Sequence, residues 1–462
     1  MKTATRLLAI FCAGILMFGA TACRSGDTSS AASVPSGGSD ASETEKVSLD
    51  GYEIHIVAPW GGMEPTADGG TEMQRLQYQR FLDVQKDFNC KIVFDAVADL
   101  YSQFEASAMA GERLGDLVLM RGEYVYSYAS QGLLYPIGDV VNLELEQFIR
   151  DNEEKCKIGD KVYAYSISRP AVEATIFFNK GLFSRLGLES PYDLMGRGEW
   201  TMENFAKLAR DATRDTDGDG KIDTYGMPAV LVDPEVIYFI AAFGGTTVKT
   251  ENGRFVSGLE DEKTTAALSF LRKMNVEDKS TLLPDDKPTW DWGIKQFMNG
   301  NCAMCQTNIT NPGVAAKDTL SDGYGIVPMP LGPGQTEYQL ISQSFLSYVM
   351  HSSMDAALAD KIGAVMEAYT APLVDEERVE EQRIQDWEQY VCDEESIETL
   401  RMLNKLPNPV FPYLGFGDAW YSSVQNQLYH CLVGNYTIAT AMATCNPVFQ
   451  ADLDRTNDRL AP

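Results

Sequence analysis

The feature of this sequence that most constrains its fold is the regular alternation of strand and helix patterns. Residues 52–57 alternate polar and β-branched side chains, which indicates a strand, and an amphipathic helix pattern follows at 73–88. Residues 91–94 predict a second strand, residues 102–110 a helix of small side chains, and residues 117–120 a buried strand. Because helices at this spacing join strands by right-handed crossovers, the pattern predicts an α/β fold with a mainly parallel sheet.

The same alternation continues along the rest of the chain. Further strands are predicted at residues 174–178 and 326–327, and further helices at 202–212, 264–273 and 292–298. The chain has 462 residues, of which 44% are hydrophobic. This length and composition suffice for two or three domain-sized units with a sizeable core.

The N-terminal segment predicts export. Lys2 and Arg6 give a positive start, and residues 7–18 form an apolar run that is shorter than the roughly 20 residues needed to span a bilayer. Small residues follow, and then Cys23. A cysteine at this place resembles the bacterial lipobox, in which the cysteine is lipidated and becomes the new N-terminus. The alternative is an ordinary secretory signal with an incidental cysteine.

We therefore interpret residues 1–22 as a lipoprotein signal peptide and residues 23–48 as a disordered tether. Residues 24–45 are mostly Ser, Gly, Ala, Thr and Asp, which is the composition of a flexible linker with almost nothing to bury. A lipid on Cys23, a tether and a folded body predict an extracellular protein anchored at the outer face of the bacterial cytoplasmic membrane.

Charge and composition exclude several classes of function. The formal net charge is -28, and so acidic a surface repels phosphate backbones and anionic lipids, which argues against nucleic acid as a partner. None of the 3 His lies in a metal-type or triad-type cluster. Of the 9 cysteines, Cys12 lies in the signal and Cys23 is reserved for lipid, so an odd number remains and at least one thiol is expected to stay free. Cys302 and Cys305 have the spacing of a redox motif, but their apolar surroundings favour buried core residues.

One short acidic motif predicts a metal site by itself. Carboxylates stand at positions 1, 3, 5 and 9 of a loop, with a glycine at position 6, where EF-hand-type loops turn sharply. The predicted ligands of a structural Ca²⁺ ion are Asp215, Asp217, Asp219, the carbonyl of Lys221, and Asp223. Position 12 is Gly226 in place of the bidentate Glu of a full EF-hand, so a weaker affinity is expected. The alternative is a solvated acidic turn.

Several stretches follow one another in the order found in a known family. They read Gly-Glu-Arg-Leu-Gly-Asp-Leu-Val at 111–118, Gln-Gly-Leu-Leu-Tyr-Pro-Ile at 131–137, Phe-Asn-Lys-Gly-Leu-Phe at 178–183, Phe-Met-Asn-Gly-Asn-Cys-Ala-Met at 297–304 and Tyr-Gly-Ile-Val-Pro-Met-Pro at 324–330. From Tyr52 to about Asn457, the chain resembles the extracellular solute-binding proteins of ABC importers (family 1), the group that contains maltose-binding protein.

The resemblance implies a two-lobe, periplasmic-binding-protein-like (type II) fold with a hinge and an interlobe cleft in which a solute is clamped. It implies one lobe at residues 49–172 with 346–405 and another at residues 173–345 with 406–462. The crossings between the lobes are expected near residues 170–173 and 343–347.

Aromatic residues are the first candidates for contacts with the solute. Trp60 follows the first predicted strand, and Trp290, Trp292 and Trp420 stand at predicted helix starts. The segment that holds Trp420 and Tyr421 resembles the helix start that stacks on sugar in maltose-binding protein. Tryptophan offers a face to the apolar C–H surface of a pyranose ring. The alternative for each tryptophan is ordinary packing in the core.

Three polar residues complete the candidate set. The resemblance aligns Glu173 with a carboxylate of the family's cleft, and Glu123 follows the third predicted strand, where maltose-binding protein has an acidic ligand. Asn308 lies where sugar binders of the family often present tryptophan, so the chain departs there from the maltose type. The two glutamates are alternatively solvated surface charges.

These observations favour a binding protein over an enzyme. The leading hypothesis is a lipid-anchored, monomeric solute-binding protein that captures a small molecule, with an oligosaccharide favoured by the aromatic residues, and delivers it to the membrane subunits of an ABC importer. One alternative is an extracellular carbohydrate-active enzyme, such as a glycosidase with Glu123 and Glu173 as paired carboxylates. Another is a ligand-sensing partner of a membrane receptor.

Overall fold

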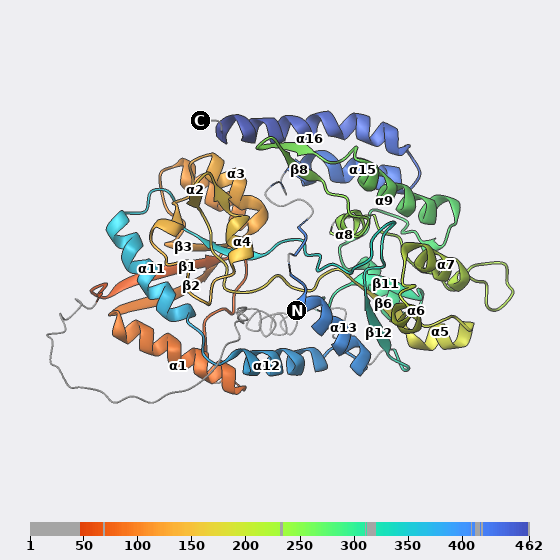
Figure 1. The fold of residues 1–462 in the computed structure, drawn as a ribbon, viewed down its shortest axis with the longest axis horizontal. Helices are drawn as coiled ribbons and strands as arrows, with labels where there is room; N and C mark the ends of the chain where they lie inside the picture. Colours follow the sequence, from red (N-terminus) through yellow and green to blue (C-terminus); the bar gives the residue numbers. More distant parts are fainter. Residues whose placement is uncertain are drawn as a thin grey trace, which may run out of the picture. The chain divides into compact units, whose positions relative to one another are not determined.

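The computed structural model describes residues 47–67, 70–231, 234–309, 311, 320–407, 409–411, 416 and 419–460. The predicted signal peptide, Cys23 and all but the end of the predicted tether lie outside these ranges. Within the ranges, no helix is both long and apolar enough to cross a bilayer. Contacts divide the chain into two compact units, whose helices and strands are labelled in Figure 1. Among the described residues, the first comprises those in 47–120, 132–169 and 346–379, and the second comprises those in 121–131, 170–345 and 380–460.

Three segments belong to a different unit from the one that the sequence suggested: residues 121–131, 170–172 and 380–405. Residues 121–131 belong to the second unit because α3 (Val125–Ser130) packs against the C-terminal helix α16 (Ile438–Leu460). Residues 380–405 also belong there because α13 (Glu394–Lys405) packs against strand β12 (Tyr324–Pro328). Both assignments depend on long-range packing, which the alternation of predicted elements does not reveal.

The first unit is built on a sheet with the strand order β13-β3-β1-β2. β1 (Tyr52–Ala58) pairs in parallel with β2 (Cys90–Ala96) and β3 (Leu117–Arg121), so the prediction of parallel pairing is confirmed in this unit. Helix α1 (Glu72–Asp87) begins at a capping box formed by Thr71 and Gln74, and it packs against α11 (Ala356–Thr370). The unit's other elements are α2 (Leu100–Met109), η2 (Ile137–Asp139), α4 (Arg150–Glu154), β4 (Lys157–Ile158), β5 (Lys161–Val162) and β13 (Leu346–Val349).

The second unit is built on a sheet with the strand order β11-β6-β12. The central strand β6 (Thr175–Asn179) pairs antiparallel with β11 (Met304–Thr307) and with β12. The prediction of a mainly parallel sheet is therefore wrong for this unit. The residue pattern of a strand shows which side chains are buried but not in which direction the strand runs. The rule for helix crossovers does not determine the direction of β6 either, because β6 follows a loop and not a helix.

Helices cover both faces of this sheet, and the side chains of β6 alternate between two cores. Ile176 and Phe178 lie in the larger core, to which helices α5 to α9 and the C-terminal helices contribute. Phe177 lies in a smaller core with residues of α10, α12 and α13. All five residues of β6 are buried, as its apolar sequence predicts.

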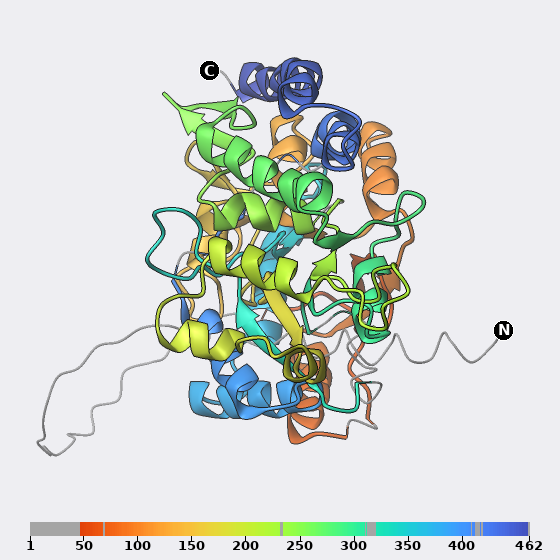
Figure 2. The same ribbon diagram turned by 90° about the vertical axis from the view of Figure 1, so that its right-hand side faces the viewer.

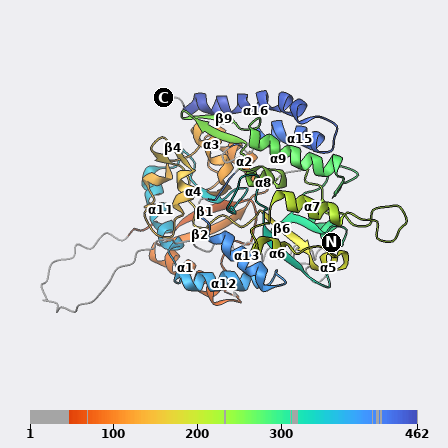
Figure 3. The same ribbon diagram turned by 45° about the vertical axis from the view of Figure 1, so that its right-hand side comes forward.

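The helices of the larger core lie in succession on one side of the unit, as seen in green and yellow in Figure 2. They are α5 (Lys180–Leu186), α6 (Pro191–Gly196), α7 (Met202–Ala212), α8 (Glu235–Ala242) and α9 (Glu262–Arg272). The C-terminal region adds η5 (Trp420–Val424), α15 (Gln425–Leu432) and α16, which lies against α15 and the hairpin of β8 (Val248–Glu251) and β9 (Arg254–Ser257) (Figure 3). The remaining elements are η1 (Gly122–Tyr124), β7 (Met227–Pro228), η3 (Lys273–Glu277), β10 (Thr281–Leu282), α10 (Trp292–Met298) and α12 (Glu376–Glu388).

The cysteines of the described residues are free thiols. They are Cys90, Cys156, Cys302, Cys305, Cys392, Cys431 and Cys445. Cys302 and Cys305 are buried beside and within β11, and burial raises the pKa of both thiols. A redox pair needs an accessible thiolate, so the structure favours the interpretation of Cys302 and Cys305 as buried core residues.

Candidate functional site

One edge of the second unit's sheet collects the polar groups that a binding site requires. Thr175, the first residue of β6, pairs with Thr307 at the end of β11 and with Pro328 at the end of β12. The carboxyl ends of β11 and β12 therefore meet the start of β6, which Glu173 precedes by two residues. Ligands of α/β proteins commonly bind beyond the carboxyl ends of strands, so this edge is where contacts are expected.

Glu173 connects three segments of the second unit at this edge. Its Oε2 accepts hydrogen bonds from the Tyr238 hydroxyl (3.1 Å), the Ser342 hydroxyl (2.8 Å) and the backbone N–H of Gln343 (2.5 Å). The Gln306 amide on β11 donates to the backbone carbonyl of Glu173 at 3.4 Å. Glu173 is therefore held by groups from α8, from β11 and from the 342–343 segment.

Glu123 lies near Glu173, but its carboxyl group is buried without the hydrogen-bond donors that surround Glu173. It is 1% exposed, neither carboxyl oxygen accepts a hydrogen bond from a described residue, and its nearest charge is Arg121 Nη1 at 3.6 Å. Burial raises the pKa of Glu123 from 4.5 to about 7, and the charge of Arg121 and the proximity of the Ser344 hydroxyl offset only part of that increase. The negative charge of Glu173 raises it further. Glu123 is thus a buried carboxyl group that is readily protonated near neutral pH.

An aromatic pocket adjoins the sheet edge within the same unit. Trp290 is 60% exposed and Trp292, the first residue of α10, is half-buried. Both line an open pocket together with Glu235, Gln306, Thr307, Asn311 and residues of the 227–231 segment. Asn308 follows β11 directly and is half-buried.

Hydrogen bonds and an ion pair fix the start of α10. The Thr289 hydroxyl donates to Asp291 Oδ1 at 2.7 Å, and Lys295 Nζ is 2.5 Å from Asp291 Oδ2. These partners also lower the pKa of Asp291. They hold the loop that presents the two tryptophans. An indole face beside amide and hydroxyl groups can bind a ring that has apolar faces and a hydroxylated rim.

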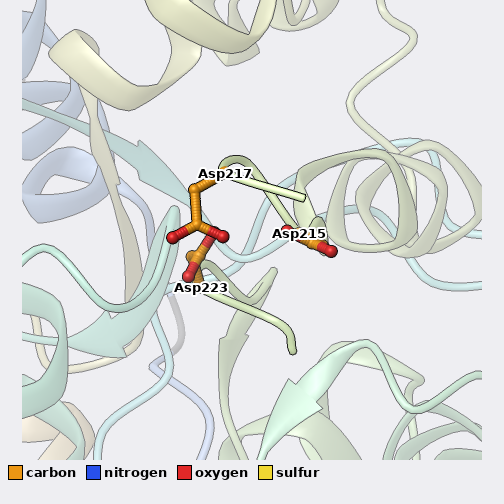
Figure 4. A group of neighbouring side chains, drawn as sticks. All are labelled: Asp215, Asp217 and Asp223. Carbon is orange, nitrogen blue, oxygen red and sulfur yellow. The ribbon is translucent and has the colours of Figure 1, made fainter. Parts of the chain in front are cut away.

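The acidic loop is a separate feature of this unit, on the stretch that follows α7. Carboxylate oxygens of Asp215, Asp217 and Asp223 lie within 4.8 Å of one another, and all three side chains are exposed (Figure 4). Asp215 accepts the N–H groups of Gly220 (2.8 Å) and Gly218 (2.6 Å), which lower its pKa, with the Gly220 contribution the larger. The hydroxyl of Thr216 and its N–H group lower the pKa of Asp223.

The structure brings together only part of the predicted metal ligand set. Asp219 lies outside the group of three carboxylates, and it accepts the N–H of Lys221 at 2.8 Å. A side chain at position 12 has no room, because a Cβ on Gly226 would lie 2.4 Å from the Cα of Ala209. Three converging carboxylates fit a hard, oxygen-seeking cation such as Ca²⁺, with fewer protein ligands than a full EF-hand supplies.

The profile of the family described as bacterial extracellular solute-binding protein matches residues 64–357, which is more than half of the chain. The chain belongs to this family. No curated protein matches it. The family is one of binding proteins, and its members of the maltose-binding type belong to ABC importers.

Solved structures of this family share the fold. A maltose/maltodextrin-binding domain of Bdellovibrio bacteriovorus, bound to maltotriose, is 16% identical with a TM-score of 0.58, over 87% of this chain and 100% of that one. UspC of M. tuberculosis is 15% identical with a TM-score of 0.62, over 86% and 99%. The substrate-binding protein Lmo0181 of Listeria monocytogenes, in complex with cycloalternan, is 15% identical with a TM-score of 0.58, over 88% and 99%. The likeness establishes the two-lobe α/β fold.

Among the candidate aromatic residues, Trp420 requires a correction. It is 1% exposed and lies in the larger core with Val424, Leu428 and Phe449, so its ring is not presented to a solute. Its neighbour Tyr421 is 38% exposed. Consecutive residues of a helix point in different directions, and the sequence alone does not show which of two adjacent aromatic residues faces inward. Trp60 is half-buried and packs against the core of the first unit.

Residues that the sequence did not predict as site residues also build the site. Tyr238, Ser342 and Gln343 surround Glu173, and Gln306 connects it to the pocket. No local pattern marks these residues, because each is brought to the sheet edge from a different segment. Of the two predicted carboxylates, Glu123 is buried, and three donors occupy one oxygen of Glu173.

The first prediction concerns Glu123. Its raised pKa means that the native state retains a proton that the unfolded chain releases between pH 4.5 and about 7, so stability falls as the pH rises through this window. Glu123→Gln should remove this loss and raise the free energy of unfolding at about pH 8 by on the order of 3 kcal/mol, with little change at about pH 4. Urea unfolding at several pH values measures the difference. The exposed substitution Glu112→Gln is the control, and an equal pH response of both variants would contradict the prediction.

The second prediction compares how much Trp420 and Trp290 each contribute to the free energy of unfolding. Trp420→Ala should lower the free energy of unfolding by about 3–5 kcal/mol because it leaves a large cavity in the core. Trp290→Ala should lower it by less than about 0.5 kcal/mol because the ring is largely exposed. Chemical denaturation of the two variants measures both values. A small loss for Trp420→Ala would restore its ring as a candidate for solute contact.

Proposed function

We propose that this chain is a lipid-anchored extracellular solute-binding protein that binds an oligosaccharide and delivers it to the membrane subunits of an ABC importer. The observation that carries the proposal is the pocket lined by Trp290 and Trp292 together with Gln306 and Thr307. Such a pocket combines an aromatic face with amide and hydroxyl groups, which suits the alternating apolar and polar surface of a sugar ring.

The ligands of similar proteins support the same class of solute. Structures of this fold have been solved with maltotriose, maltotetraose and cycloalternan, all of which are oligosaccharides. One is bound to the monosaccharide tagatose. Trp60, Asn308 and Tyr421 remain predicted contacts, and the protein is proposed to act as a monomer without enzymatic activity.

The binding prediction uses maltotriose, maltotetraose and cycloalternan as probes. At least one should bind in isothermal titration calorimetry, and Trp290→Ala should weaken its affinity by about two- to tenfold, since stacking on one aromatic face contributes about 0.5–1.5 kcal/mol. Tyr436→Ala removes another exposed aromatic ring, which is 40% exposed and lies outside the pocket, and should leave the affinity unchanged. If none of the three probes binds, or if both variants bind equally well, the proposed site is wrong.

The lipid anchor is proposed from the sequence of the N-terminal segment. Cys23 supplies the thiol that would carry the lipid, and residues 24–45 supply a tether between the membrane and the folded body. Cys23→Ala should yield unprocessed or released protein, because cleavage and lipid attachment both require the thiol. Fractionation of cells followed by detection of the protein measures this. Membrane association equal to that of the parent would contradict the anchor.

We also propose that the acidic loop binds Ca²⁺ in a structural role. Three converging carboxylates support this, because like charges so close together repel one another unless a cation is bound. Ca²⁺ should raise the melting temperature by binding to the native state, and Asp217→Ala should abolish the increase. Asp219→Ala, outside the group of three, should retain part of it. An increase in Asp217→Ala as large as in the parent would show that the loop is a solvated turn.

A further inference from the structure

A chain of hydrogen bonds joins Glu173 to an exposed aromatic ring. The backbone N–H of Gln343 donates to Glu173 Oε2 at 2.5 Å, and the side-chain amide of Gln343 donates to the hydroxyl of Tyr421 at 2.9 Å. Gln343 therefore connects the carboxylate to the ring through its own backbone and side chain. All three residues belong to the second unit.

The hydrogen bonds around Glu173 indicate an internal role for this residue. Three donors converge on its Oε2, from Tyr238, Ser342 and Gln343. Oε2, which already accepts three hydrogen bonds, has little capacity left for a solute hydroxyl, so a direct contact of Glu173 with a solute would have to use Oε1. Charged acceptors also form the stronger hydrogen bonds, so Glu173 fixes the position of the 342–343 segment.

The other end of the chain is suited to contact a solute. Tyr421 is 38% exposed, and the adjacent Trp420 anchors η5 in the core. The backbone beneath Tyr421 is therefore fixed, and the bond to Gln343 restricts the remaining rotation of the side chain. A ring that is already held in place loses less conformational freedom on binding.

We propose that Glu173 is a positioning residue that acts through Gln343 to hold Tyr421 in the orientation that binds the solute. The resemblance to the family implied a direct contact between Glu173 and the ligand, and the hydrogen bonds of Oε2 point to an indirect role through Gln343. The inference deepens the proposed function and rests on it, because Tyr421 is taken as a contact of the oligosaccharide.

The first test needs no solute. Carbon-13 labelling of tyrosine Cζ gives one NMR signal per tyrosine, and Tyr421→Phe identifies the signal of Tyr421. Glu173→Ala should shift or broaden this signal, whereas Glu173→Gln, which keeps an acceptor for Gln343, should change it less. Tyr238→Phe is the matched control, since it removes another donor from the same oxygen without removing Gln343's acceptor. An unchanged Tyr421 signal in Glu173→Ala would overturn the proposal.

The second test measures affinity for the oligosaccharide that binds best among the three probes. Glu173→Ala should weaken binding by about fivefold in the parent but by less than about twofold in Tyr421→Phe, because the two substitutions interrupt one chain. Equal losses in both backgrounds would show that Glu173 contacts the solute itself and would overturn the proposal. If no probe binds to the parent, the proposed function fails, and the NMR result alone decides whether Glu173 positions Tyr421.

Discussion

The complete burial of β6 on both faces is the constraint on which the second unit depends. Ile176 and Phe178 are packed into one core and Phe177 into the other, so no side chain of this strand is available to a solute. The polar groups described for the candidate site lie where the strand begins. The position of Glu173, Gln306 and Thr307 follows from this arrangement, and the same sheet that stabilises the unit also fixes the geometry of the candidate site.

Two glutamates at this edge show how environment assigns different roles to one residue type. Glu173 Oε2 accepts hydrogen bonds from three donors, whereas Glu123 is buried, with Arg121 as its nearest charge at 3.6 Å among the described residues and a raised pKa of about 7. The resemblance to the family aligned both with ligand contacts. Hydrogen bonds hold the carboxyl group of Glu173, and burial raises the pKa of Glu123, and neither property is visible in the sequence.

The elements of the fold were largely predictable, and their arrangement was less so. Helices 202–212 and 292–298 have the bounds that their periodicity predicts, because local apolar spacing determines which face is buried. The antiparallel direction of β6 was missed, because direction depends on distant strands. The exposed Trp290 and the buried Trp420 both stand near predicted helix starts, and only the packing around each ring distinguishes them.

The free thiols have a consequence for how the protein can be handled. Since the cysteines of the described residues form no disulfide with one another, the folded body does not depend on an oxidant and can be produced in a reducing compartment. Cys392 is the one exposed thiol among them, while Cys90 is half-buried and the others are buried. Among the described cysteines, Cys392, just before α13, is therefore the thiol most accessible to a maleimide dye, and it offers a natural labelling position for fluorescence studies of the second unit.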